Sequence, residues 1–302
     1  MKGLELSESY YYEVGKNALS ETVPGAKGLW AAGLVGEGSE CFSFDDDISR
    51  DHDWGPGFCV WVSEGVYTLY GAELEAAYNS LPKEYKGYKR LETSLAGKRV
   101  GIFKVSDFYS RFLGVSVPPK TNMEWLSLPE QNLSLATNGK VFEDPAGDFT
   151  KIRSVLLKFY PEEVRKKKIA ACLARMAREG QYNFKRCKKR NDTYAELIAA
   201  GEFCQNAIRV LHLLNYVYCP YYKWALKSLK NIKGCKNVSR LIEELSVNFD
   251  EDLVEEICLE IIKMLKAQGL SACEGTFLQE HALEIFESIK DPDLKRLHLL
   301  VG

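Results

Sequence analysis

Seven carboxylates crowd into residues 37–53 of this 302-residue chain, where Arg50 is the one lysine or arginine. Repulsion at this density is relieved either by open solvent or by a divalent cation, and oxygen-rich sites are those that Mg²⁺ prefers. Asp51 and Asp53 are alternate residues shortly before the apolar run 58–62. At the start of a strand, alternate side chains point to the same face, so we expect these two carboxylates to share metal ions.

Gly38 and Ser39 lie in a glycine-containing turn upstream of the two aspartates. The apolar run 29–35 predicts a buried strand that leads into this turn. At a turn between a strand and a helix, backbone N–H groups and a hydroxyl can hold phosphate oxygens. We therefore predict that Gly38 and Ser39 bind phosphate.

A Gly-Ser pair, a short spacer and then Asp-x-Asp resembles the signature of the nucleotidyltransferase superfamily, which includes polymerase beta and the aminoglycoside nucleotidyltransferases. The resemblance implies that the Gly38–Ser39 turn holds a nucleoside triphosphate and that Asp51 and Asp53 bind two catalytic Mg²⁺ ions. It further implies that an acceptor hydroxyl attacks the α-phosphate in line and that pyrophosphate leaves.

The sequence around this signature also resembles a largely uncharacterised family of bacterial proteins. Members of that family have a nucleotidyltransferase-like N-terminal domain and a helical C-terminal domain of unknown function. The resemblance is carried by residues 38–40, 44–56, 180–183 and 214–224. It covers much of residues 28–230.

The third carboxylate that superfamily members usually supply from a later strand is missing at the expected place. The best match to that strand is residues 99–104, which contain no acid, and Asp107 follows on the next helix. Two alternatives remain. Asp45, Asp46 or Asp47 replaces the missing group, or the protein binds nucleotides with weak or lost transferase activity.

Residues 158–192 form a basic segment with twelve lysines and arginines against four acids. We interpret residues 165–168 as a solvated helix face, because two glutamates lie one turn before them. Arg186 and Arg190 share one helix face, and a guanidinium suits phosphate oxygens. Lys223 lies near a predicted helix N-terminus, which attracts anions. We predict that these last three residues bind the nucleotide, or alternatively that Lys223 only extends from a hydrophobic core.

The patterns divide the chain near residue 120. Residues 1–120 are expected to form an α+β nucleotidyltransferase-like catalytic domain, a small mixed sheet with flanking helices. Residues 121–302 are expected to form an all-helical substrate-binding domain, because strand signals disappear past residue 119. Helices are predicted at residues 9–19, 67–80, 108–113, 161–180, 194–216, 221–229, 253–265 and 283–289.

Composition narrows the class of protein. An apolar fraction of 46% and a charged fraction of 27% are those of a soluble globular protein. A net charge of −2 argues against a long nucleic-acid partner, although the basic segment leaves room for a short one. The nine cysteines include no CxxC pair, which indicates reduced thiols in a cytoplasmic protein. No signal peptide or membrane span is visible.

The sequence therefore predicts a cytoplasmic, Mg²⁺-dependent nucleotidyltransferase that moves a nucleoside monophosphate, AMP from ATP, onto an unknown hydroxyl acceptor. That acceptor is a small molecule, a protein side chain or an RNA terminus. A nucleotide sensor without chemistry is the alternative. A loop that binds only calcium or solvent ranks last, because it lacks the glycine and terminal glutamate of an EF-hand. Base preference and oligomeric state follow from no motif in the sequence.

Overall fold

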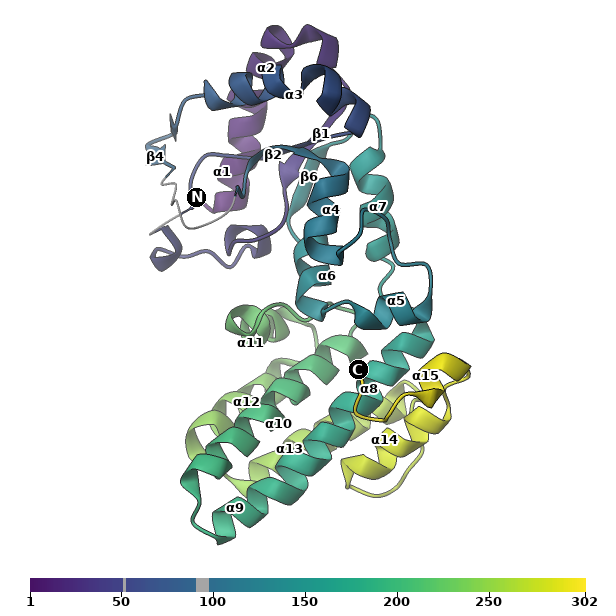
Figure 1. Cartoon of the computed structure of the whole chain (residues 1–302). Coiled ribbons are helices and arrows are strands. Elements are labelled where there is room, and N and C mark those ends of the chain that lie inside the picture. Colours follow the sequence, from purple (N-terminus) through teal and green to yellow (C-terminus); the bar gives the residue numbers. More distant parts are fainter. Residues whose placement is uncertain (51–52, 91–97) are drawn as a thin grey trace. The chain divides into compact units, whose positions relative to one another are not determined.

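The chain folds into two compact units in a computed structural model (Figure 1). The structure describes residues 1–50, 53–90 and 98–302. The first unit contains Met1–Pro118 and Asn132–Lys158, and the second contains Pro119–Gln131 and Phe159–Gly302. The single boundary predicted near residue 120 differs from this division, because residues 132–158 return to the first unit.

A four-stranded mixed sheet forms the centre of the first unit, in the order β5-β2-β1-β6. β2 runs antiparallel to β1 and parallel to β5, and β6 runs antiparallel to β1. The strands are β1 (Trp30–Leu34), β2 (Cys59–Val62), β5 (Gly101–Lys104) and β6 (Lys140–Glu143). A separate two-stranded ribbon consists of β3 (Glu84–Tyr85) and β4 (Tyr88–Lys89).

Three of these strands lie where apolar runs predicted them. β6 does not, since it falls in the part of the chain predicted to contain no strands. It has only two apolar residues, flanked by a lysine and a glutamate, and none of the four is fully buried, so the segment has no hydrophobic run or alternation long enough to mark a strand. Pairing with β1, more than a hundred residues earlier in the chain, makes the segment a strand.

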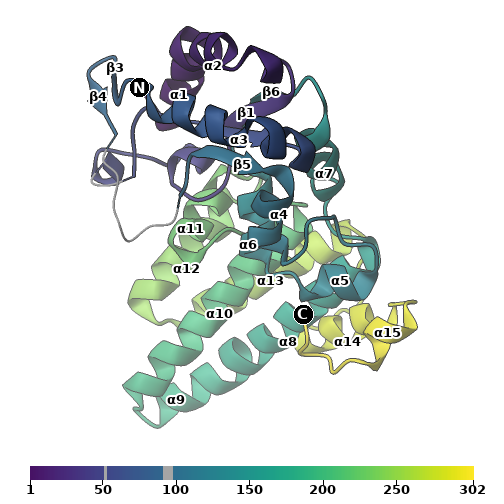
Figure 2. The ribbon, with the colours of Figure 1, turned by 45° about the horizontal axis from the view of Figure 1, so that its top comes forward.

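Helices cover both faces of the sheet (Figure 2). On one face, Ala32, Val60 and Ile102 pack against the N-terminal helices and α3 in a continuous core. On the other face, the Trp61 ring stacks on Phe149, with ring centroids 3.9 Å apart. The helices are α1 (Gly3–Tyr10), the π-helical segment η1 (Tyr11–Gly15), α2 (Lys16–Thr22), α3 (Glu64–Asn79), α4 (Val105–Leu113), α6 (Glu130–Thr137), whose first two residues belong to the second unit, and α7 (Asp148–Leu156).

The second unit is all helical. The long helices α8 and α10 pack together, and α14 packs against α8. Gly180, in the π-helical segment after α8, lets α10 pack closely against that segment, because a Cβ there would lie 2.2 Å from the Phe203 ring. The elements are α5 (Asn122–Ser127), α8 (Glu162–Met176), the π-helical segment η5 (Ala177–Phe184), α9 (Lys185–Lys189), α10 (Thr193–Leu214), α11 (Tyr222–Asn231), α12 (Lys236–Asn248), α13 (Glu251–Ala267), α14 (Leu278–Glu287) and α15 (Pro292–Arg296).

The predicted fold class, an α+β domain followed by an all-α domain, is confirmed. Across the described residues, no helix combines the length and the apolar character that crossing a bilayer requires.

Candidate functional site

The Gly38–Ser39 turn follows directly from β1. Gly38 has a φ of +123°, and a Cβ at this position would lie 1.8 Å from Nη2 of Arg99. Only glycine therefore lets this guanidinium approach the backbone. The helix after the turn, η3 (Glu40–Phe42), is a single 3₁₀ turn, so it contributes little of the dipole expected at a full helix N-terminus. The Ser39 hydroxyl makes no hydrogen bond to any described residue.

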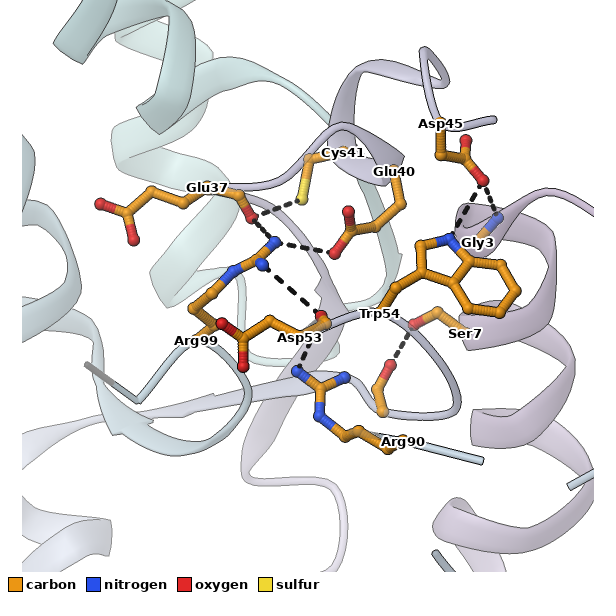
Figure 3. A network of polar contacts seen from close by, with 12 residues as sticks. Gly3, Ser7, Glu37, Glu40, Cys41, Asp45, Asp53, Trp54, Arg90 and Arg99 are labelled. Atoms are coloured by element: carbon orange, nitrogen blue, oxygen red, sulfur yellow. Dashed lines mark hydrogen bonds and ion pairs between the residues drawn. The ribbon is translucent and has the colours of Figure 1, made fainter. Parts of the chain in front are cut away.

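Arg99 joins the two halves of the motif. Its Nη2 donates to the Glu37 carbonyl at 2.6 Å and to Oε1 of Glu40 at 2.8 Å. Its Nη1 donates to the Asp53 carbonyl at 3.5 Å, and Nη2 of Arg90 donates to the same oxygen at 3.4 Å. Figure 3 shows Arg99 between the turn and Asp53. Two segments that are separate in sequence are thus linked through one guanidinium.

Asp53 is buried and close to the turn, but it is not on a strand. β2 begins only at Cys59, and Asp53 has a left-handed backbone with a φ of +52°. The expectation that alternate positions of a strand align Asp51 with Asp53 is therefore wrong for Asp53. An aspartate tolerates this backbone better than most residues. Asp51 lies outside the described residues.

The three aspartates considered as replacements for the missing acid have other partners. Asp45 is buried and accepts hydrogen bonds from the Gly3 N–H at 2.8 Å and from Nε1 of Trp54 at 3.2 Å. Asp46 accepts hydrogen bonds from Ser49. The Asp47 side chain is 94% exposed. Asp45 thus anchors the N-terminal helix, and the replacement of the missing acid by one of these three aspartates remains a prediction.

Burial dominates the electrostatics of the turn. It raises the pKa of Glu40 above its ordinary value, and the Arg99 guanidinium opposes part of that shift. Burial also raises the pKa of the neighbouring Cys41 thiol well above its usual range. A protonated, buried thiol is a poor nucleophile. Cys41 is therefore a structural residue of the turn.

The strand that usually supplies the third acid has a backbone reason to lack one. Gly101 at the start of β5 has a φ of +119°, a region that residues with a Cβ rarely adopt. Asp107, on the first turn of α4, lines a cavity of about 190 Å³ together with Glu37, Arg99 and Arg111. The structure thus brings Asp107 to the same cavity as the turn residues, which sequence spacing did not indicate.

A metal ion needs several ligand atoms close together. Among the described side chains, one group has three potential ligand atoms within 4.8 Å of one another, namely Cys273, His281 and Glu284 in the second unit. The Ser271 hydroxyl donates to Glu284 and pairs with Nδ1 of His281 at 2.7 Å, so this group forms an internal hydrogen-bond network. The acidic residues 37–50 and Asp53 do not form such a group among themselves. Their oxygens suit Mg²⁺ chemically.

The predicted phosphate ligands of the second unit are exposed. Nη1 of Arg186 donates to the Tyr182 hydroxyl at 2.7 Å, and Arg190 follows at the exposed end of α9. Lys223 lies in the first turn of α11 with its ammonium 5.6 Å from the centre of the Trp224 ring. Their nucleotide contacts remain predictions.

The expected solvated face at residues 165–168 is wrong. Arg165, Lys167 and Lys168 have exposed fractions of 2%, 0% and 3%. Arg165 pairs with Glu162, and its Nη1 reaches Oε1 of Gln268 at 3.1 Å. The side chains of these three residues are enclosed by segments that are distant in sequence. The glutamates one turn away therefore could not indicate that the side chains are buried.

Two comparisons with known proteins gave a match. Residues 125–225 match a domain of unknown function (DUF4037). The crystal structure of a nucleotidyltransferase-like protein from Exiguobacterium sibiricum 255-15 aligns over 92% of this chain and 81% of that chain, with a TM-score of 0.38 and 11% identity. No curated protein matches. A likeness this distant carries no weight for activity, which has to be argued from the site.

Proposed function

We propose that this protein is a Mg²⁺-dependent nucleotidyltransferase that transfers a nucleoside monophosphate, AMP from ATP, to a hydroxyl acceptor. One observation carries the proposal, namely that Arg99 binds both the Gly38–Ser39 turn and the backbone of Asp53. A phosphate-binding turn and a metal-binding carboxylate have to be adjacent for phosphoryl transfer, because both act on the same triphosphate.

Two residues of the turn and the neighbouring Arg99 could bind the phosphates of a nucleotide. The Ser39 hydroxyl has no hydrogen-bond partner among the described side chains and backbone groups. Gly38 leaves room for close approach to its backbone. The Arg99 guanidinium donates hydrogen bonds to backbone carbonyls and to Glu40. A bound phosphate could replace these acceptors, because a guanidinium binds phosphate oxygens with two parallel hydrogen bonds.

Asp53 and Asp51 would hold the metal. The carboxylates of Glu40 and Asp45 accept hydrogen bonds from Arg99, Gly3 and Trp54. Mg²⁺ bound by the two aspartates would stabilise negative charge on the phosphate oxygens. The buried position of Asp53 excludes competing water from its carboxylate.

Glu40 and Asp107 are the acids available to accept the acceptor proton. Burial raises the pKa of Glu40, which brings a carboxylate closer to the range of a useful general base. Asp107 borders the cavity that contains Arg99. Substitution of each by its amide distinguishes them, because only the base should move the lower limb of the pH–rate profile.

Isothermal titration of ATP, GTP, CTP and UTP with Mg²⁺ tests the proposal. We expect one triphosphate to bind the wild-type protein and to lose at least tenfold in affinity in Asp53→Asn and in Arg99→Gln. Asp47→Asn is the matched control, since it removes an exposed acid of the same loop. Absence of triphosphate binding by the folded protein, or equal binding by Asp53→Asn, would overturn the proposal.

A nucleotide sensor is the second candidate, favoured by the glycine backbone at position 101 and by the dispersed acids of the described loop. It predicts Mg²⁺-dependent binding without release of pyrophosphate. Pyrophosphate in stoichiometric excess over the protein would exclude it.

A further inference from the structure

The second unit contains a buried group of ionisable side chains that the transfer reaction does not use. We call Glu130, Lys168 and Arg209 the Glu130 cluster. Their side chains are 6%, 3% and 24% exposed. Oε1 of Glu130 lies 2.8 Å from Nη2 of Arg209 and 3.9 Å from Nζ of Lys168. Two cations therefore share one carboxylate.

The surrounding groups do not supply a second negative charge. Burial raises the pKa of the Cys172 and Cys219 thiols and of the Tyr160 hydroxyl, so all three are neutral at pH 7. Burial lowers the pKa of His212, which keeps its ring neutral. Arg175 nearby adds further positive charge. The Glu130 cluster is consequently short of one anion.

Two nitrogen donors of the Glu130 cluster, on Arg209 and on Lys168, have no hydrogen-bond acceptor among the described residues. Arg209 directs Nε and Nη2 to the two oxygens of Glu130, and its Nη1 has no hydrogen-bond partner in the described part of the chain. The Lys168 ammonium likewise makes no hydrogen bond to a described residue. Burial lowers the pKa of Lys168 and Glu130 offsets only part of that shift. Neither nitrogen is fully enclosed, so each can meet water or a ligand.

A cavity opens onto Arg209. Its volume is about 730 Å³, within the range of small-molecule sites. Glu130 and Arg209 line it together with Gln131 and Gln205, two exposed amides. Tyr221 and Tyr222 also line it, with ring centroids 4.2 Å apart. The cavity therefore combines the Arg209–Glu130 ion pair, amides and aromatic rings.

We propose that this cavity binds a small ring-bearing molecule through a single oxyanion, a carboxylate or a phosphoryl group, that meets Nη1 of Arg209. One negative charge balances the excess positive charge of the Glu130 cluster. The ring of the ligand packs on Tyr221 and Tyr222, and the two glutamines accept or donate to its polar substituents. This site lies within the second unit and does not depend on the transferase activity.

Gln205→Glu provides a sharp test. Positions 205 and 209 are one turn apart on α10, so the new carboxylate would pair with the open edge of Arg209 and exclude an anionic ligand. Gln205 is exposed, so the substitution leaves the core intact. Gln279→Glu is the matched control, the same change on α14, whose residues do not line this cavity.

The probes are benzoate and phenyl phosphate, compared with acetate, inorganic phosphate and the neutral benzyl alcohol, titrated into the full-length protein at low salt. We expect a ring-bearing anion to bind with a Kd on the order of 1 mM, as suits so small a fragment. The ring-free and uncharged probes should bind at least tenfold more weakly. The preference between benzoate and phenyl phosphate identifies the oxyanion.

In Gln205→Glu we expect at least a tenfold loss of affinity with an unchanged thermal midpoint, whereas Gln279→Glu should bind like the wild type. Tyr222→Ala, at an exposed position, should weaken the aromatic probe but not the ring-free one. Absence of binding by every anion, or equal binding by Gln205→Glu and wild-type protein, would overturn the proposal.

Discussion

The two units hold charge clusters of opposite composition. Around the Gly38–Ser39 turn, Arg99 lies among the oxygens of Glu37, Glu40 and Asp53, in a loop that is rich in acids. In the Glu130 cluster, a single carboxylate lies between Lys168 and Arg209. A surplus of carboxylates calls for a cation, and a surplus of buried cations calls for an anion. The sign of the local surplus therefore indicates what each unit would bind.

The largest effect is expected from Asp53→Asn. An amide keeps the shape of the side chain but loses the charge that a metal ion needs, so pyrophosphate release over a panel of hydroxyl acceptors should fall about 10³-fold. The exposed control Asp47→Asn should stay within twofold of the wild type. Comparable losses in both variants would show that the acidic loop acts only through its net charge.

Glu130→Gln should produce the largest loss of stability. It leaves Lys168 and Arg209 buried without a negative partner, which should lower the free energy of unfolding by about 3–5 kcal/mol in urea denaturation. Exposed Glu243, paired with Lys230, provides a control, because Glu243→Gln should cost less than about 1 kcal/mol. If Glu130→Gln lost no more stability than Glu243→Gln, the negative charge of Glu130 would not be needed for the stability of the cluster.

The same substitution has a pH signature. Burial alone would raise the pKa of Glu130, but Arg209 and Lys168 hold it below its ordinary value of 4.5. The stabilisation is therefore complete above pH 4.5 and is lost as the pH falls through the lower pKa of the folded state. The stability difference between wild type and Glu130→Gln should narrow only in that acidic range. A constant difference down to pH 2 would contradict this assignment.

Gly38→Ala should have a smaller effect on stability. The new Cβ would overlap Nη2 of Arg99 and would also strain a backbone with φ of +123°, at a total of about 2–3 kcal/mol. Gly28→Ala separates the two causes, because Gly28 has a φ of +78° and open space around its Cβ position. Equal losses in urea denaturation of both variants would exclude a role for the overlap with Arg99.

The smallest stability effect concerns Lys167, which is fully buried and donates to the His298 carbonyl at 2.8 Å. Burial lowers its pKa to about 8 from 10.5. Between these values the unfolded chain binds more protons than the folded one, so stability should rise with pH across this range. Lys167→Met should remove this rise in denaturant melts from pH 8 to 10.5. An unchanged slope would contradict it.

Local sequence patterns predicted most elements of both units. Short apolar runs predicted the strands β1, β2 and β5. In α10, apolar residues recur at helical spacing over many turns, which predicted a long helix. β6 was missed because its hydrogen bonds to β1, not its own residues, make it a strand. The boundary predicted near residue 120 lies next to the division after Pro118, but the return of residues 132–158 to the first unit was not predicted.

The motif residues Gly38, Ser39 and Asp53 could be selected from the sequence, because their spacing is local and resembles a known signature. Arg99 could not. It lies some sixty residues from the turn that it binds, and only the parallel pairing of β5 with β2 brings it there. The Glu130 cluster escaped for a similar reason, since its three members come from three helices.

The sequence by itself determined the types of the long helices and of the three apolar strands, the acidic loop and the chemistry that its residues can offer, because these depend on neighbours within a few positions. The tertiary structure decided which charges are buried together. It turned Lys167 and Lys168 inward and set Arg99 against Gly38. An unpaired charge is costly when it is buried. Contacts between residues distant in sequence, more than composition, therefore determine where a ligand is needed.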